Sequence, residues 1–66
     1  MKATINGRVR DLPDELTVGA LLEMLGSPSA GIAVARNERI VLRCEYDTDR
    51  LREGDRIEIV TAVAGG

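Results

Sequence analysis

Few of the 66 residues have side chains suited to chemistry, and the chain end stands out among what remains. The sequence contains no histidine and a single cysteine, Cys44. It therefore has no Cys–His or Ser–His nucleophile pair and no imidazole metal ligand. The last six residues, 61–66, carry no charged side chain and finish on Gly65 and Gly66. The reactive group that this composition leaves is the carboxylate of Gly66, and we expect another protein to supply the catalytic groups.

The tail at 61–66 ends in two residues without side chains. Glycine has no Cβ, so Gly65 and Gly66 could pass through a channel too narrow for other residues. A Gly-Gly end arises by chance in roughly 0.5% of chains at average glycine usage, and chain ends are often disordered whatever their sequence. The Gly-Gly end alone is therefore weak evidence that the chain end is functional. We expect a globular domain over residues 1–60 and a flexible tail over 61–66.

Cys44 is the other candidate for chemistry, as a persulfide carrier. Nothing beside it in the sequence marks an activated thiol, and a free cysteine more often behaves as a small hydrophobic residue. We favour an inert Cys44. One cysteine cannot form an intramolecular disulfide, and a small domain without disulfides is typical of a reducing compartment, so we expect the cytoplasm.

Charge and hydropathy argue against two classes of partner. Nine Lys and Arg residues are scattered among eleven Asp and Glu residues, for a net charge of −2, whereas nucleic-acid binding needs clustered positive charge. No apolar run approaches the roughly 20 residues that span a bilayer, and the first five residues suggest a strand rather than a signal peptide. We expect no nucleic acid, membrane or metal to be bound.

The elements that would position the tail begin with a β-hairpin. Asn6-Gly7 readily adopts the positive φ angles of a type I′ turn, which would pair Ile5 with Arg8. Val9 and Leu12 have opposite parity, so both could face the core only if the strand contained a bulge. The register after the turn is therefore left open.

A helix follows, with start and stop signals at both ends. Thr17 suits the N-cap because its hydroxyl can accept from a free backbone N–H of the first turn. Gly26 suits the left-handed residue after the last turn, and Pro28 prevents continuation. The helix should bury one apolar stripe against a sheet, formed by Val18, Leu21, Leu22 and Leu25.

Three more strands are predicted after Gly31. Residues 32–36 and 39–42 form a second hairpin around Asn37-Glu38, and residues 56–60 form the last strand. We expect Tyr46 to anchor the loop before that strand. Alternation predicts that the inward side chains are Ile32, Val34, Ile40, Leu42, Ile57 and Ile59, with Val41 pointing outward.

The order strand, strand, helix, strand, strand, strand describes an α+β domain with one helix packed on one face of a sheet. The opposite face should be apolar enough to dock a partner protein, although single exposed aliphatic residues need no explanation of their own. The residues predicted to form this docking face are Ala33, Ala35, Val41, Val60 and Ala62.

Six segments of the sequence together resemble one known family. They are Asn6-Gly7, Thr17-Val18 leading into Leu21-Leu22, Gly31-Ile32-Ala33-Val34, Leu51-Arg52-Glu53-Gly54-Asp55, Glu58-Ile59-Val60 and Gly65-Gly66. The chain is similar over essentially its whole length to the ThiS family of thiamine-biosynthesis sulfur carriers. This resemblance implies a ubiquitin-like β-grasp fold with a mixed five-stranded sheet.

The resemblance also implies a mechanism. A partner enzyme of the ubiquitin-activating (ThiF-like) type would use ATP to adenylate the Gly66 carboxylate, and a sulfur donor would convert the adenylate to a thiocarboxylate. A ThiG-like thiazole synthase would receive the sulfur. In this picture Gly65 keeps the approach free of side chains, the chain binds no cofactor of its own, and it is a protein co-substrate rather than an enzyme.

Two departures from the family pattern are present, and alternatives stay open. Glu38 stands where members usually place the glycine of a second Asn-Gly turn, and Leu42-Arg43-Cys44 replaces a segment that is often Pro-Arg-Ser. The alternatives are the small subunit of molybdopterin synthase, which is usually richer in Phe and Pro near its end, a ubiquitin-like protein modifier, and a non-catalytic interaction domain.

Overall fold

The computed structural model describes residues 1–27 and 31–61 and contains one sheet and one α-helix in that part of the chain. In chain order the elements are β1 (Lys2–Ile5), β2 (Arg8–Asp11), α1 (Val18–Leu25), β3 (Ile32–Arg36), β4 (Arg39–Val41), the 3₁₀ turn η1 (Arg43–Glu45) and β5 (Arg56–Thr61).

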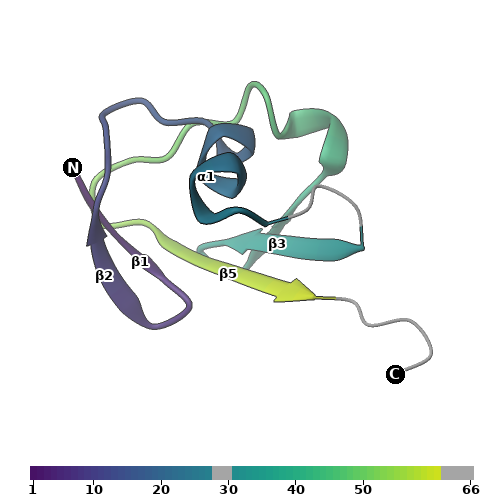
Figure 1. Cartoon of the computed structure of the whole chain (residues 1–66), viewed down its shortest axis with the longest axis horizontal. Helices are drawn as coiled ribbons and strands as arrows, with labels where there is room; N and C mark the ends of the chain where they lie inside the picture. The colour runs from purple at the N-terminus through teal and green to yellow at the C-terminus, as the bar shows by residue number, and fades with distance from the viewer. Residues whose placement is uncertain (28–30, 62–66) are drawn as a thin grey trace.

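The five strands lie in the order β2-β1-β5-β3-β4, and α1 covers one face of the sheet (Figure 1). β1 and β5 are parallel, whereas the other neighbouring strands are antiparallel. This mixed sheet with one helical layer confirms the predicted α+β architecture. The last strand in the sequence is therefore the middle strand of the sheet.

Both hairpins close through two-residue turns with positive φ at each central residue. The angles are 49° at Asn6 and 82° at Gly7, and 52° at Asn37 and 69° at Glu38. Positive φ at both positions defines the type I′ turn, whose twist matches that of the flanking strands. The predicted pairing of Ile5 with Arg8 is confirmed.

The sequence left the pairing of the first two strands open, and the structure shows that they pair without a bulge. β1 and β2 pair residue for residue from Ile5↔Arg8 to Lys2↔Asp11. Val9 is exposed on one side of β2, and Leu12, just beyond the strand, is buried in the core. Val9 and Leu12 therefore point to opposite faces of the sheet, and only Leu12 reaches the core.

The predicted orientation of β4 is wrong. Val41 is only 6% exposed, whereas Ile40 is 67% exposed and Leu42 is 57% exposed. The reason is the tight turn: with Arg36 opposite Arg39, Val34 must lie opposite Val41, and directly opposite residues share a face. Val34 belongs to the core, so Val41 does too.

The helix α1 has the ends that its sequence predicts. The Oγ1 of Thr17 accepts a hydrogen bond from the backbone N–H of Ala20 at 3.1 Å. Gly26 has a φ of 69°, and the N–H groups of Gly26 and Ser27 donate to the carbonyls of Glu23 and Leu22. This pair of bonds is the Schellman motif, which ends the helix after Leu25.

The core lies between α1 and the inner face of the sheet and is almost entirely aliphatic. Tyr46 is buried there, as expected for an anchor of the loop before β5. That loop also caps α1, because the carbonyls of Tyr46 and Asp49 accept from the N–H groups of Gly19 and Val18. The buried core consists of Ala3, Ile5, Leu12, Val18, Leu21, Leu22, Val34, Val41, Tyr46, Leu51 and Ile57.

Candidate functional site

The strand β5 leads from the middle of the sheet toward the chain end. It starts at Arg56, as predicted, and runs one residue further than expected, to Thr61. Ile57 is buried and Ile59 packs against the core, which confirms their inward orientation. Gly65, Gly66 and Ala62 lie outside the described residues, so their predicted roles remain predictions.

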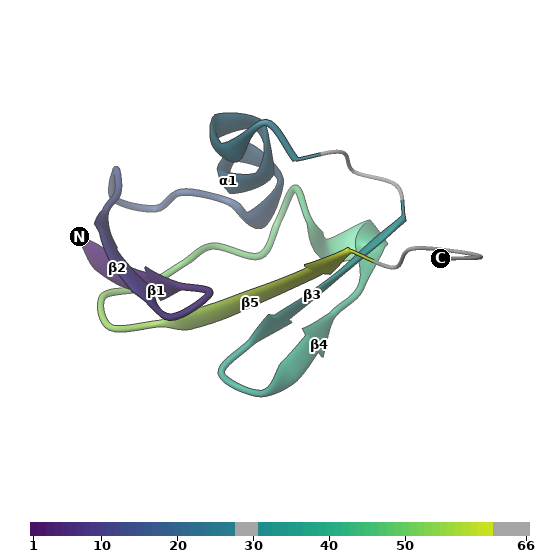
Figure 2. The same cartoon turned by 60° about the horizontal axis from the view of Figure 1, so that its bottom comes forward.

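The sheet face opposite α1 carries an apolar patch over β5, β3 and β4. Val60 is 60% exposed and pairs with the exposed Ala33, and Ala35 pairs with Ile40 on the neighbouring strand. We refer to these four residues, Ala33, Ala35, Ile40 and Val60, as the outer patch. Figure 2 shows β5, β3 and β4 side by side beneath α1.

Three of the predicted docking residues therefore lie on the expected face and one does not. Ala33, Ala35 and Val60 face away from the helix, and Val41 is buried. Ile40 takes the place that the sequence had assigned to Val41. The signal that would have found Ile40 was present, because a two-residue turn at Asn37-Glu38 already places Val41 opposite the core residue Val34.

Charged side chains border the outer patch on the same face. Arg56 and Glu58 alternate with the buried Ile57 along β5, and Glu58 lies opposite Ala35. Lys2 lies further along the face, on β1, next to the buried Ala3. An apolar centre with a charged border is the usual composition of a surface that binds another protein.

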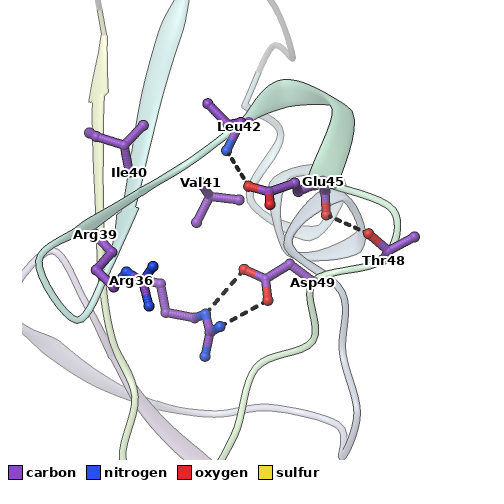
Figure 3. Close-up of a pocket in the computed structure, with 8 residues that line it drawn as sticks. All are labelled: Arg36, Arg39, Ile40, Val41, Leu42, Glu45, Thr48 and Asp49. Carbon is purple, nitrogen blue, oxygen red and sulfur yellow. Dashed lines mark hydrogen bonds and ion pairs between the residues drawn. The ribbon is translucent and has the colours of Figure 1, made fainter.

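A hollow of about 530 Å³ lies beside the patch, between β4 and the segment that begins with η1 (Figure 3). Arg36 crosses its base and binds Asp49 through two hydrogen bonds of 2.9 and 3.1 Å. Glu45 closes the upper side, where its carboxylate accepts from the backbone N–H of Leu42 at 2.8 Å. The Arg36–Asp49 hydrogen bonds hold the β3–β4 hairpin against the loop beside the hollow.

Asp55 ties the same hairpin to the start of β5. Its side chain accepts from Asn37 at 3.0 Å, from the backbone N–H of Arg52 at 2.8 Å and from Arg36 at 3.3 Å. Burial by itself would raise the pKa of Asp55, but these hydrogen bonds and the Arg36 charge outweigh it and hold the pKa below its ordinary value. The carboxylate is therefore ionised and structural at neutral pH.

Residues 1–27 and 31–61 contain neither a cluster of metal ligands nor a helix that spans a membrane. No group of three or more His, Cys, Asp or Glu residues there could hold a metal ion. Within those ranges α1 is the sole α-helix, and it is too short to cross a bilayer. Cys44 is exposed on η1, which does not match the buried position that a small hydrophobic residue would favour.

Comparison with known proteins places these features in a family. The model of the ThiS family matches residues 3–66. The sulfur carrier protein ThiS of Thermus thermophilus is 37% identical over 62 residues, which cover 94% of this chain and 95% of that protein. The thiazole synthase of Paramagnetospirillum magneticum is 42% identical over 66 residues, which are all of this chain but 20% of that protein. The chain thus spans about a fifth of that thiazole synthase.

The fold agrees with the sequence comparison. The crystal structure of the thiamine biosynthesis protein ThiS from Geobacter metallireducens matches with a TM-score of 0.86 and 28% identity, and both chains are covered completely. The mixed sheet and single helix described above are thus the β-grasp architecture of that protein. With the match extending over residues 3–66, this chain belongs to the ThiS family.

Proposed function

We propose that this chain is a sulfur carrier for thiamine biosynthesis and that the Gly66 carboxylate carries the sulfur as a thiocarboxylate. The observation that supports this best is the family match, which extends through Gly65 and Gly66 to the end of the chain. The similar carrier from Thermus thermophilus has nearly the same extent, because the match covers 95% of it.

The chemistry explains why a partner and ATP are needed. A carboxylate resists nucleophiles until one of its oxygens becomes part of a good leaving group. Attack of the Gly66 carboxylate on the α-phosphorus of ATP would release pyrophosphate and form an acyl adenylate. Hydrosulfide, or a donor that delivers sulfur at the same oxidation level, would then displace AMP and leave the thiocarboxylate. The chain binds no cofactor in this scheme, and an adenylating enzyme of the ubiquitin-activating type supplies the catalytic groups.

The outer patch is the surface that we assign to docking the adenylating enzyme. Its four residues lie on β5 and on the two strands to one side of it, and Val60 is six residues before Gly66 in the sequence. Docking holds the reacting group near the catalytic site and lowers the entropy cost of reaction. Val41 has no direct part in this contact, because it is buried.

A thiazole synthase is the proposed acceptor of the sulfur. The supporting observation is that the thiazole synthase of Paramagnetospirillum magneticum contains a stretch similar to the whole of this chain. Covalent linkage of a carrier and its acceptor would make transfer intramolecular and raise the effective concentration of the thiocarboxylate. We place the reaction in the cytoplasm, whose reducing conditions suit a thiocarboxylate and the unpaired Cys44.

Intact-mass spectrometry tests the proposed function. The purified chain is incubated with ATP, an adenylating enzyme and a sulfur donor, and a variant that lacks Gly65 and Gly66 serves as the control. We expect the full chain to gain the mass of one oxygen-to-sulfur replacement and the control to keep its mass. A full chain that stays unchanged beside a reacting ThiS from Thermus thermophilus would contradict the proposal, and lysine-linked adducts would instead favour a protein modifier.

A further inference from the structure

The strand β5 is held differently along its two edges. On one edge, β3 pairs with it continuously from Arg36↔Ile57 to Ile32↔Thr61. On the other edge, β1 pairs with it only at Thr4↔Arg56 and Ile5↔Ile57, because β1 turns away at Asn6. Figures 1 and 2 both show β5 extending past the β1–β2 hairpin. Among residues 1–27 and 31–61, the half of β5 nearer the chain end therefore has a backbone neighbour on one edge only.

The side chain of Asn6 continues the pairing where the backbone of β1 stops. Its Oδ1 accepts from the backbone N–H of Ile59 at 2.8 Å, and its Nδ2 donates to the carbonyl of Ile59 at 3.3 Å. The Asn6 backbone N–H donates to Ile57 at 2.9 Å. A primary amide has the donor and the acceptor of a peptide group, so Asn6 extends the ladder by one strand residue.

The second hairpin contains a counterpart that acts on the other end of β5. Asn37 is also the first residue of a type I′ turn, and its Oδ1 accepts from the backbone N–H of Arg56 at 2.9 Å. Its own backbone N–H donates to the carbonyl of Arg56 at 2.8 Å. Asn37 thus holds the start of β5 from the β3 edge, and Asn6 holds its later half from the β1 edge.

We infer that Asn6 is a positioning residue for the reaction at the chain end, an inference that rests on the proposed function. Ile59 lies on the strand that leads to Gly66, and it stands between the docking residue Val60 and the paired start of β5. Without the Asn6 amide, the backbone of β5 near Ile59 would have more conformations. The enzyme would have to exclude these each time it aligned the Gly66 carboxylate with ATP. The Asn6 amide removes that freedom before docking occurs.

Substitution of each asparagine by glycine separates this role from ordinary turn formation. Asn6→Gly and Asn37→Gly both preserve a residue that tolerates positive φ, so both turns remain accessible. Asn37→Gly removes one side-chain hydrogen bond to the start of β5 and one to Asp55, whereas Asn6→Gly removes two to the half of β5 nearer the chain end. The measurements are amide hydrogen exchange on the free chain and the kinetics of pyrophosphate release with the adenylating enzyme and ATP, as the chain concentration is varied.

For Asn6→Gly we expect the Ile59 amide to exchange about fivefold faster, the factor for one hydrogen bond of ~1 kcal/mol. We also expect kcat to fall roughly 5- to 30-fold, the cost of ordering about one more backbone residue. KM should stay within about twofold, because the docking surface is intact. Asn37→Gly should accelerate exchange at Arg56 and leave kcat within about twofold of the wild type.

Two results would overturn the inference while leaving the proposed function in place. One is a wild-type kcat for Asn6→Gly, and the other is an equal fall in kcat for both variants, which would show a general loss of stability. Absence of pyrophosphate release from the wild-type chain, with a reacting ThiS from Thermus thermophilus alongside, would remove the proposed function and this inference together.

Discussion

Glu38 occupies a backbone conformation that its side chain disfavours. Its φ of 69° lies in the left-handed region, where a residue with a Cβ meets the neighbouring carbonyl and where glycine does not. The strain persists because Arg36↔Arg39 pairing on either side leaves only two residues to reverse the chain. Glu38 is exposed, so little in its surroundings offsets the strain.

Replacing Glu38 with glycine should stabilise the protein. Relief of the left-handed strain is worth about 1 kcal/mol, which corresponds to a rise in Tm of roughly 4–8 °C for a domain of this size. Thermal unfolding followed by circular dichroism measures the shift. Glu58→Gly, the same exchange at an exposed strand position, should lower Tm because glycine weakens a strand. If both variants melt earlier than the wild type, Glu38 is not strained.

Asp55 should make stability depend on acid pH. Its pKa is held below the ordinary value of an aspartate, so its contribution is present in full above that ordinary value and is lost as pH falls through the folded-state pKa. Urea unfolding at pH 6 and at successively lower pH would show this loss. Asp55→Asn should be less stable at pH 6 by about 1–3 kcal/mol, the cost of weakened buried hydrogen bonds, and its acid dependence should be shallower.

At the level of elements, β4 shows how a turn can decide which residues are buried. Ile40, Val41 and Leu42 are all strong strand formers, so composition does not distinguish the two possible faces. The two-residue turn sets the register and places Val41 opposite Val34 on β3, which is buried in the core. A shift of one residue would exchange the two faces of β4. Figure 3 shows Ile40 and Val41 pointing to different sides of the strand.

Alanine substitutions in β4 test this orientation. Val41→Ala should destabilise the protein by about 1–3 kcal/mol, because it removes buried methyl groups and leaves a cavity. Ile40→Ala removes a larger side chain but should cost about 0.5 kcal/mol or less, because the position is exposed. Chemical denaturation of both variants gives the comparison. The reverse ranking would mean that the register described for β4 is wrong.

For the whole molecule, the single helix leaves the sheet with two different faces. α1 and the loop that caps it cover one face and bury the core. The other face stays open and carries the outer patch around β5, the strand that leads to Gly66. A one-helix domain of this size thus keeps a surface for a partner on the strand whose sequence continues into the group that we propose is modified.

An aspartate in the outer patch should weaken docking. Ile40→Asp should raise KM for the chain in the adenylation assay at least tenfold, because it puts a charge in place of the largest side chain of the apolar patch, with little change in kcat. Val9→Asp is the matched control, because Val9 is equally exposed but lies on β2, at the opposite edge of the sheet. Equal effects of the two substitutions on KM would contradict docking at the outer patch.

Local signals in the sequence were sufficient for the elements themselves. Thr17 and Gly26 predicted both ends of α1, Asn6-Gly7 predicted the first hairpin, and Ile57 and Ile59 predicted the inner face of β5, because caps, turns and alternation act over a few residues. The α+β class followed from the order of these elements. The family resemblance rested on the same segments and extended to Gly66.

Tertiary structure decided what depends on residues far apart in the chain. Asn6 reaches Ile59 across 53 positions, a contact that no local pattern around either residue indicates. The strand order that places β5 between β1 and β3 likewise joins the two ends of the described chain. Such contacts form only when the sheet is assembled, because hydrophobic burial and strand pairing select one arrangement from several that local preferences permit equally.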